Sequence, residues 1–313
     1  MTEPVEPRVV ALTGATAVGK TEVALALADR RAISIISMDS AMVYRGMDIG
    51  TAKPAAAVRE RYPHALVDVC DPLDSFTVAD FLHAADAAVR EAWQANRLPV
   101  LVGGTMLYLQ AFREGLAALP GADPVVRQRI EVEAAARGWQ VLHQRLQRID
   151  PIAAQKIHPN NRPRLQRALE VYELTGKPIS SFWSAANRSN TTKRLGGRLL
   201  EFAIEPDDRK ILHRHIERRF DAMLALGFLT EVSALRARVL DPSLPALRAV
   251  GYRQAWEHLE GRYDAHEMRE RVIIATRQLA KRQLTWLRGW PGLNRLVWGD
   301  PQRLADEIDQ QLT

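Results

Sequence analysis

The sequence predicts an α/β protein in which a parallel sheet is flanked by helices and interrupted by an all-helical insertion. Three observations support this prediction. Short apolar segments alternate with helical ones up to about residue 105, a glycine-rich loop joins the first strand to the first helix, and residues 123 to about 172 are helical in pattern with no strand candidate. Since strands that alternate with helices form parallel sheets, we expect a core domain of residues 1–120 and 198–313 and a helical insertion domain of residues 121–197.

The individual elements follow from local patterns. Apolar, β-branched runs predict strands at residues 8–13, 33–38, 64–69, 98–102, 198–204 and 293–298. Helical spacing predicts one helix at residues 22–28, one at 78–93 with Thr77 as a candidate cap, and several long helices between residues 206 and about 289. The small polar residues at 180–197 are typical of a loop.

Composition limits the class of protein. The chain of 313 residues is 47% hydrophobic and 26% charged, as is usual for soluble globular proteins. Its one cysteine, Cys70, excludes an internal disulfide and indicates a reducing compartment. No apolar run approaches the about 18 residues of a membrane span, and residues 1–7 lack a signal-peptide pattern. We therefore expect a cytoplasmic protein and, without a coiled-coil pattern, a monomer.

A net charge of +6 has two interpretations, solubility alone or a polyanionic partner such as a nucleic acid. Two basic segments are relevant to this choice. One spans residues 158–167, and the other combines Arg277, Lys281, Arg282 and Arg288 with Trp286 and Trp290. Basic side chains beside aromatic rings suit RNA, although each segment is also compatible with a solvated helix over core tryptophans. Together with a phosphate-binding loop they favour a nucleic-acid substrate.

The first strand is followed by the P-loop motif G-x-x-x-x-G-K-T, formed by Gly14, Ala15, Thr16, Ala17, Val18, Gly19, Lys20 and Thr21. The backbone amides of such a loop converge on phosphate oxygens, and the helix N-terminus adds partial positive charge. Lys20 provides a point charge, and the Thr21 hydroxyl can bind Mg²⁺. The motif predicts a P-loop NTPase-like fold and a phosphate-bearing ligand. Whether that ligand is ATP is left open.

Two further loops belong at the same edge of the sheet, because ligands of parallel sheets bind at the carboxyl ends of the strands. Asp39 follows the second strand, where it can accept a proton, hold Mg²⁺ through water, or cap a helix. Gly103, Gly104 and Thr105 end the fourth strand, either as a ligand-binding turn or as a plain one. Asp68 and Asp71 flank the third strand, where turn capping is favoured over a metal role.

Six segments resemble motifs of the bacterial tRNA dimethylallyltransferase family, in order along nearly the whole chain. They are the P-loop, DSAMVYRGMDIGTAKP at residues 39–54, VGGT at 102–105, HPN at 158–160, RAVGYRQ at 248–254 and KRQLTWLR at 281–288. The family transfers a dimethylallyl group from dimethylallyl diphosphate to N6 of the adenosine on the 3′ side of the anticodon. The resemblance therefore implies a prenyl-transfer enzyme acting on the anticodon stem-loop of tRNA.

The resemblance also implies roles for individual residues. The P-loop would hold the donor diphosphate with Mg²⁺ assisting, Arg219 would support the diphosphate, Asp39 would act as the general base, and Thr105 would lie beside donor and tRNA. Positions that correspond to tRNA contacts are Asp39, Ser40, Ala41, Met42, Thr105, Arg127, Pro163, Arg164, Leu165, Gln166, Arg167, Leu247, Arg248, Ala249, Val250, Gly251, Lys281, Arg282, Gln283, Leu284, Thr285, Trp286, Leu287 and Arg288.

The sequence departs from the family at two places. His215 stands where the family often has a second arginine, four residues before Arg219, so diphosphate binding would depend more on Lys20 and Arg219. Arg162-Pro163 follows the HPN motif and leaves the register of the nearby tRNA contacts open.

Two other functions are compatible with a P-loop. A kinase of a nucleotide or small metabolite would use the same loop, although Gly103-Gly104 stands where a kinase usually has an acidic residue after the strand. An RNA-binding protein with a degenerate P-loop is the non-enzymatic alternative, and it requires that donor diphosphate fails to bind.

Overall fold

The computed structural model describes residues 6–184, 189–239 and 241–312. The chain forms two compact units, one of Met1–Arg113 with Thr191–Thr313 and one of Glu114–Asn190. Of the stretches discussed above, residues 1–5 of the N-terminal segment and residues 185–188 of the expected loop lie outside the described residues.

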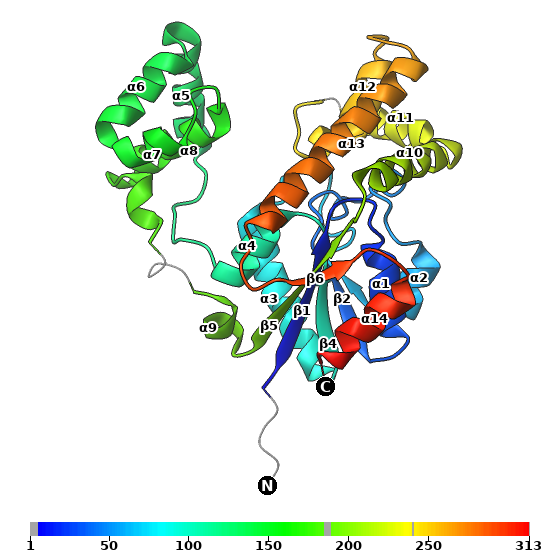
Figure 1. Cartoon of the computed structure of the whole chain (residues 1–313). Coiled ribbons are helices and arrows are strands. Elements are labelled where there is room, and N and C mark those ends of the chain that lie inside the picture. The colour runs from blue at the N-terminus through cyan, green and yellow to red at the C-terminus, as the bar shows by residue number, and fades with distance from the viewer. Residues whose placement is uncertain (1–5, 185–188, 240, 313) are drawn as a thin grey trace. The chain divides into compact units, whose positions relative to one another are not determined.

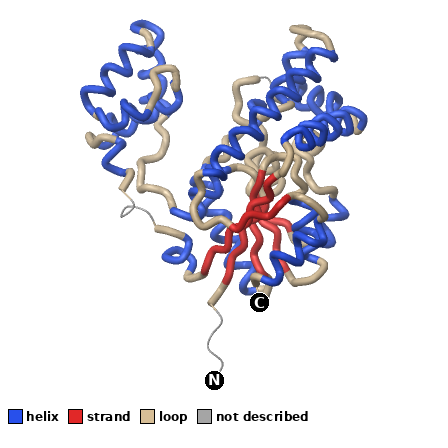
Figure 2. Tube along the Cα trace, viewed as in Figure 1, coloured by secondary structure: helices blue, strands red, loops and turns tan. Residues whose placement is uncertain are grey.

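The described part of the first unit contains a six-stranded, fully parallel sheet in the order β3-β2-β4-β1-β5-β6 (Figure 2). Its strands are β1 (Arg8–Gly14), β2 (Ile33–Ser37), β3 (His64–Ala65), β4 (Leu98–Val102), β5 (Arg198–Glu205) and β6 (Asn294–Val297). The predicted α/β class is confirmed. The third strand is shorter than the expected residues 64–69, because Leu66 and Asp68 have φ angles of 62° and 58°, which no strand accommodates.

The helices of this unit cover both faces of the sheet and extend beyond it. They are α1 (Lys20–Ala28), α2 (Ala56–Arg61), α3 (Val78–Gln94), α4 (Met106–Glu114), α9 (Thr191–Leu195), α10 (Arg209–Ala225), α11 (Phe228–Arg238), the 3₁₀ helix η3 (Ala246–Arg248), α12 (Tyr252–Leu259), α13 (Ala265–Arg288) and α14 (Pro301–Gln310). Thr77 caps α3 through a capping box with Asp80, as its sequence position suggested. None of the described helices is both long and apolar enough for a membrane span.

Alternation along β1 assigns side chains to two cores. Val10 and Leu12 pack with α1 and α14 on one face, whereas Val9 and Ala11 pack with α3 and α4 on the other. Figure 1 shows these two pairs of helices on opposite sides of the sheet. A strand buried on both faces reads as a continuous apolar run, as observed here. A third core joins α10–α13 to the loop around Met47. These four helices lie beyond the carboxyl ends of the strands, where the ligand loops are (Figure 1).

The described residues of the second unit form helices and no strand: α5 (Pro124–Arg137), α6 (Trp139–Ile149), α7 (Pro151–Lys156), α8 (Arg162–Thr175) and the 3₁₀ helix η1 (Ile179–Phe182). Asp123 and Asp150 cap α5 and α7, each ahead of a proline in the first turn. The fully buried Ile130, Leu142 and Leu165 belong to a core of its own.

Candidate active site

The P-loop turns sharply between β1 and α1 because its two glycines have no side chain. Gly14 has a φ of 148°, and a Cβ atom there would lie 2.6 Å from the carbonyl oxygen of Ile204. Gly19 has a φ of 77° and precedes the first turn of α1 in a left-handed conformation. L-residues rarely adopt these angles. The motif therefore has the strand–loop–helix context that phosphate binding requires.

Two cationic side chains meet at this loop. The Lys20 ammonium group donates to the carbonyl oxygens of Ala15 (2.8 Å) and Gly14 (3.2 Å), and Arg219 of α10 donates to the Thr16 hydroxyl (3.4 Å). Burial and the positive charge of Arg219 lower the pKa of Lys20 to about 8. Burial likewise lowers the pKa of Arg219. Two desolvated cations at one loop favour the approach of an anion.

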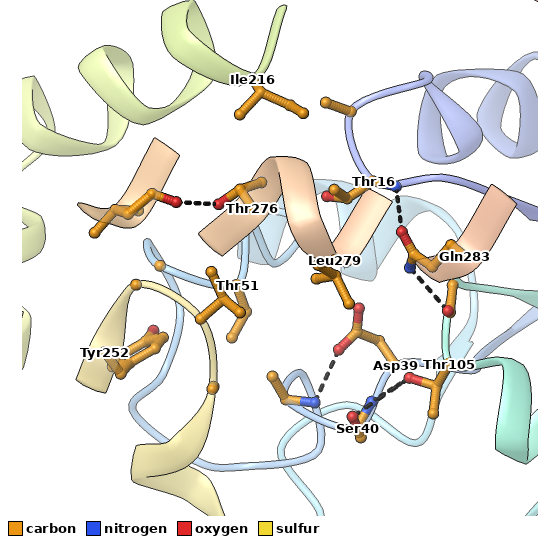
Figure 3. Close-up of a pocket in the computed structure, with 18 of the residues that line it drawn as sticks. Thr16, Asp39, Ser40, Thr51, Thr105, Ile216, Tyr252, Thr276, Leu279 and Gln283 are labelled. Carbon is orange, nitrogen blue, oxygen red and sulfur yellow. Dashed lines mark hydrogen bonds between the residues drawn. The ribbon is translucent and has the colours of Figure 1, made fainter. Parts of the chain in front are cut away.

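Asp39 belongs to a turn and does not cap an α-helix, which corrects one of its sequence-based interpretations. One carboxylate oxygen accepts hydrogen bonds from the backbone amides of Ala41 (2.8 Å) and Met42 (3.4 Å). The Thr105 hydroxyl accepts a hydrogen bond from the Ser40 amide at 3.0 Å (Figure 3). Asp39 and Thr105, from loops 66 residues apart, are thereby fixed beside each other at one edge of the sheet.

Two adjoining cavities lie at this edge. The larger, about 900 Å³, is lined by the P-loop residues 16–21, and the smaller, about 470 Å³, is lined by Asp39, Ser40 and Thr105. Their shared border includes Thr16, Asp39, Thr51, Gly104, Arg219, Met223, Leu279 and Gln283. The smaller cavity also has an apolar wall of Ile216, Phe220, Met223, Phe228, Val272 and Leu279. A phosphate-binding compartment thus opens onto a compartment with a carboxylate and an apolar wall.

A hydrogen-bond network that the sequence did not reveal holds the wall between the cavities. The Glu231 carboxylate of α11 accepts hydrogen bonds from the backbone amides of Asp48 (2.8 Å), Ile49 (2.7 Å) and Gly50 (3.1 Å), and from the Tyr252 hydroxyl (2.6 Å). Burial and the Glu231 charge raise the pKa of Tyr252. In the sequence Glu231 is an ordinary acidic residue in a first helical turn, and only its partners reveal its role.

Lys53 also stabilises the wall between the cavities. Its ammonium group is buried and pairs with both Asp48 and Asp68, and Asp68 also pairs with Arg59 at 2.8 Å. Asp71 accepts the Leu73 amide at 3.0 Å and pairs with Arg238. Asp71 therefore caps a turn, as the sequence suggested, whereas the Asp68 carboxylate is engaged in ion pairs.

The segment of α13 that resembles tRNA contacts has two kinds of side chain. Lys281, Arg282, Thr285, Trp286 and Arg288 are exposed, and Arg282 and Trp286 also line the smaller cavity. Gln283 and Leu287 are buried, and Leu284 is half-buried. Trp290 is buried and donates to Glu201 at 3.0 Å, so its interpretation as an RNA-stacking residue is wrong. Arg277 pairs with Glu217 of α10.

The other predicted tRNA contacts also include both exposed and buried residues. Arg248 is exposed, and it lines the smaller cavity together with Ala249, Val250 and Gly251, whereas Leu247 is buried. In the second unit Pro163 and Arg164 are exposed and Leu165 is buried. The side chains of Leu165, Leu247 and Leu287 stabilise the fold, which leaves only their backbone for a tRNA contact.

Three predicted contacts of the second unit hold that unit together. The fully buried Glu170 carboxylate receives hydrogen bonds from Arg127 (2.9 Å) and Arg167 (2.6 Å). Burial alone would raise the pKa of Glu170, but these guanidinium groups hold it below its ordinary value. Gln166 donates to Glu131 and to the carbonyl of Arg127. Arg127 keeps a partly exposed side chain.

His215 replaces the arginine expected from the resemblance, and its ring packs edge-on against Trp298 with 4.6 Å between the centroids. Both line the larger cavity near the P-loop. Metal-ligating side chains do not gather in the described residues, where no three His, Cys, Asp or Glu form a group that could hold a metal ion.

Comparison with known proteins agrees with this geometry. Family models described as IPP transferase and isopentenyl transferase match residues 42–290 and 7–62. The tRNA dimethylallyltransferases of Thioalkalivibrio sulfidiphilus and Alkalilimnicola ehrlichii are 54% and 50% identical to this chain, over 95% and 99% of it and 92% and 96% of their own lengths.

A solved structure is similar over almost its whole length. The tRNA isopentenylpyrophosphate transferase of Bacillus halodurans has a TM-score of 0.71 and 36% identity, with 98% of this chain and 95% of that chain covered. The resemblance seen in the motifs is thereby confirmed, and the chain belongs to the IPP transferase family of tRNA dimethylallyltransferases.

Proposed function

We propose that this protein is a tRNA prenyltransferase that moves a dimethylallyl group from dimethylallyl diphosphate to N6 of the adenosine on the 3′ side of the anticodon. The observation that carries the proposal is the border between the two cavities. Arg219 of the cationic P-loop site and the Asp39 carboxylate both line it, so a leaving diphosphate and an acceptor amine can approach one carbon from different compartments. A kinase would not need the apolar wall, and the comparisons do not favour one.

The P-loop side of the border suits the leaving group. As the C1–O bond of the donor breaks, negative charge develops on the diphosphate. The P-loop amides, Lys20 and Arg219 can stabilise that charge because they already lie around one loop before the reaction. Lys20 would exchange its bonds to the Ala15 and Gly14 carbonyls for the diphosphate oxygens. The apolar wall suits the five-carbon tail, whose burial contributes about 0.8 kcal/mol per CH₂ group.

The opposite side of the border suits the acceptor. One Asp39 oxygen is engaged with the turn amides, which fixes the carboxylate. We propose that Asp39 takes the proton from N6 as the new N6–C1 bond forms, a contribution of about 10²–10⁴-fold to the rate. The target base has to leave its stack to reach this depth, as base-modifying enzymes require.

We propose that Thr21 binds Mg²⁺ through its hydroxyl, at the start of α1 and within the larger cavity. When bound there, the ion would offset the charge of the diphosphate oxygens.

We also propose that the protein acts as a monomer with its tRNA contacts on both units. The residues that line the two cavities all come from one unit of one chain. Exposed basic residues that correspond to family contacts include Arg164 of the helical unit and Lys281, Arg282 and Arg288 of α13.

Binding of tRNA is expected to weaken steeply with salt. Arg288→Ala should reduce the slope of log K against log salt concentration by about one, because one phosphate contact and its counterion release are lost. The slope is measured by filter binding or fluorescence titration across salt concentrations. An unchanged slope for Arg288→Ala would reject a phosphate contact there, and a flat dependence in the parent protein would reject tRNA as the partner.

The reaction itself is tested by product analysis. Unmodified tRNA is incubated with the protein, Mg²⁺ and dimethylallyl diphosphate, then digested to nucleosides and examined by mass spectrometry. We expect N6-dimethylallyladenosine at the position 3′ to the anticodon. A tRNA variant with guanosine there is the control, and its modification elsewhere would contradict the assigned target.

A further inference from the structure

Gln283 is the buried polar residue that connects the two halves of the site. Only 7% of it is exposed, although its neighbour Arg282 on α13 is exposed. Its carbonyl oxygen accepts the Thr16 amide at 2.9 Å, and its amide nitrogen donates to the Gly104 carbonyl at 2.8 Å (Figure 3). Both polar ends of the side chain are therefore satisfied by backbone groups of two different ligand loops.

The hydrogen bonds of Gln283 connect to residues that we propose act on the donor and on the acceptor. On the donor side, the hydroxyl of the same Thr16 receives the hydrogen bond from Arg219. On the acceptor side, Gly104 precedes Thr105, whose hydroxyl accepts the amide of Ser40, the neighbour of Asp39. A path of hydrogen bonds and short backbone segments thus connects Arg219 to the turn that contains Asp39.

The fit around this amide is close. A Cβ atom on Gly104 would lie 2.3 Å from the Gln283 amide nitrogen, so a side chain at that position would displace the amide from its present place. The buried Ala280 and Leu287, one turn away on each side, fix the rotation of α13. Gln283 also lines both cavities. The position of the Gln283 side chain is therefore determined by Gly104, by the P-loop and by the buried residues of α13.

We propose that Gln283 is a positioning residue that holds the P-loop and the Asp39–Thr105 pair in register, so that donor carbon and acceptor nitrogen meet in line. This role replaces the tRNA contact that the family resemblance implied for Gln283, and it rests on the proposed prenyl transfer. Each polar end of the side chain already bonds to a loop of the site, and only 7% of the residue is exposed, so Gln283 presents little surface to RNA.

The test compares Gln283→Met with the parent protein. Methionine has similar length and volume but cannot form either hydrogen bond, which leaves a buried amide and a buried carbonyl unpaired. We expect kcat to fall about 10- to 50-fold through misalignment and the KM for dimethylallyl diphosphate to rise, while the tRNA dissociation constant stays unchanged. Gln278→Met, the same substitution at an exposed position of α13, should leave all three unchanged.

A second variant and a binding measurement distinguish a positioning role of Gln283 from a direct tRNA contact. Gln283→Glu keeps an acceptor for the Thr16 amide but places a carboxylate beside the P-loop, so it should weaken inorganic diphosphate binding, measured by calorimetry, more than Gln283→Met does. Circular dichroism checks that both variants are folded. Weakened tRNA binding with normal kcat at saturating tRNA would restore the contact role and overturn the proposal, as would unchanged kinetics. Absence of transfer by the parent protein would instead refute the proposed function.

Discussion

Asp39→Asn is expected to lower kcat by about 10²–10⁴-fold, because the amide cannot take the N6 proton. The substitution keeps an oxygen that can accept the Ala41 and Met42 amides, so the turn and the Thr105 contact should persist. The tRNA dissociation constant and the donor KM should therefore change little. Single-turnover kinetics with saturating tRNA and donor measure the loss directly.

Asp39→Ala is the matched comparison, since it removes both the base and the acceptor of the turn. If Asp39 acts as a base, the two variants lose a similar factor in kcat, and Asp39→Ala additionally weakens substrate binding. An asparagine variant with normal turnover, beside an inactive alanine variant, would show that Asp39 only shapes the turn.

Lys20→Met is expected to lower kcat/KM for dimethylallyl diphosphate by about 10³-fold, as removal of a charge aimed at a leaving group does in other preorganised sites. The same variant should be more stable than the parent when no ligand is present. The Lys20 ammonium group is desolvated beside Arg219, and the depressed pKa shows that the fold disfavours its charge.

The pH dependence of both effects follows from the Lys20 pKa of about 8. In the free protein Lys20 loses its charge above this pH, so donor affinity should fall as pH rises from about 8. The unfolded chain keeps the proton up to its ordinary pKa of 10.5, so the parent gains stability over that interval and the advantage of Lys20→Met narrows. Thermal unfolding at pH 7 and pH 9.5 measures the difference. A destabilised Lys20→Met variant at pH 7 would contradict the account.

The parts of the fold that sequence analysis predicted well are those specified by local chemistry. The P-loop glycines and the apolar runs of β1, β2 and β4 are determined by backbone conformation and by burial on both faces. The placement of Asp39 and Thr105 at one edge follows from the rule that parallel strands end together. These predictions need no knowledge of which distant residues meet.

The parts that failed depend on partners far away in the chain. The apolar residues after Ala65 suggested a longer strand, but the positive φ of Leu66 and the ion pairs of Asp68 end it early. Trp290 was indistinguishable from the exposed Trp286 by composition, and only the burial around Glu201 separates them. The role of Glu231 likewise depends on distant residues, because this side chain of α11 binds the backbone of a loop 183 residues earlier in the chain.

The central claim is that the P-loop binds a prenyl diphosphate and delivers the prenyl group to tRNA. The most direct measurement incubates the protein with Mg²⁺ and unmodified tRNA, with radiolabelled dimethylallyl diphosphate in one reaction and γ-labelled ATP in another. We predict that label moves from the prenyl donor to tRNA, and that Asp39→Asn slows this transfer by about 10²–10⁴-fold. Transfer of label from ATP, with none from dimethylallyl diphosphate, would contradict the account and place the protein among the kinases.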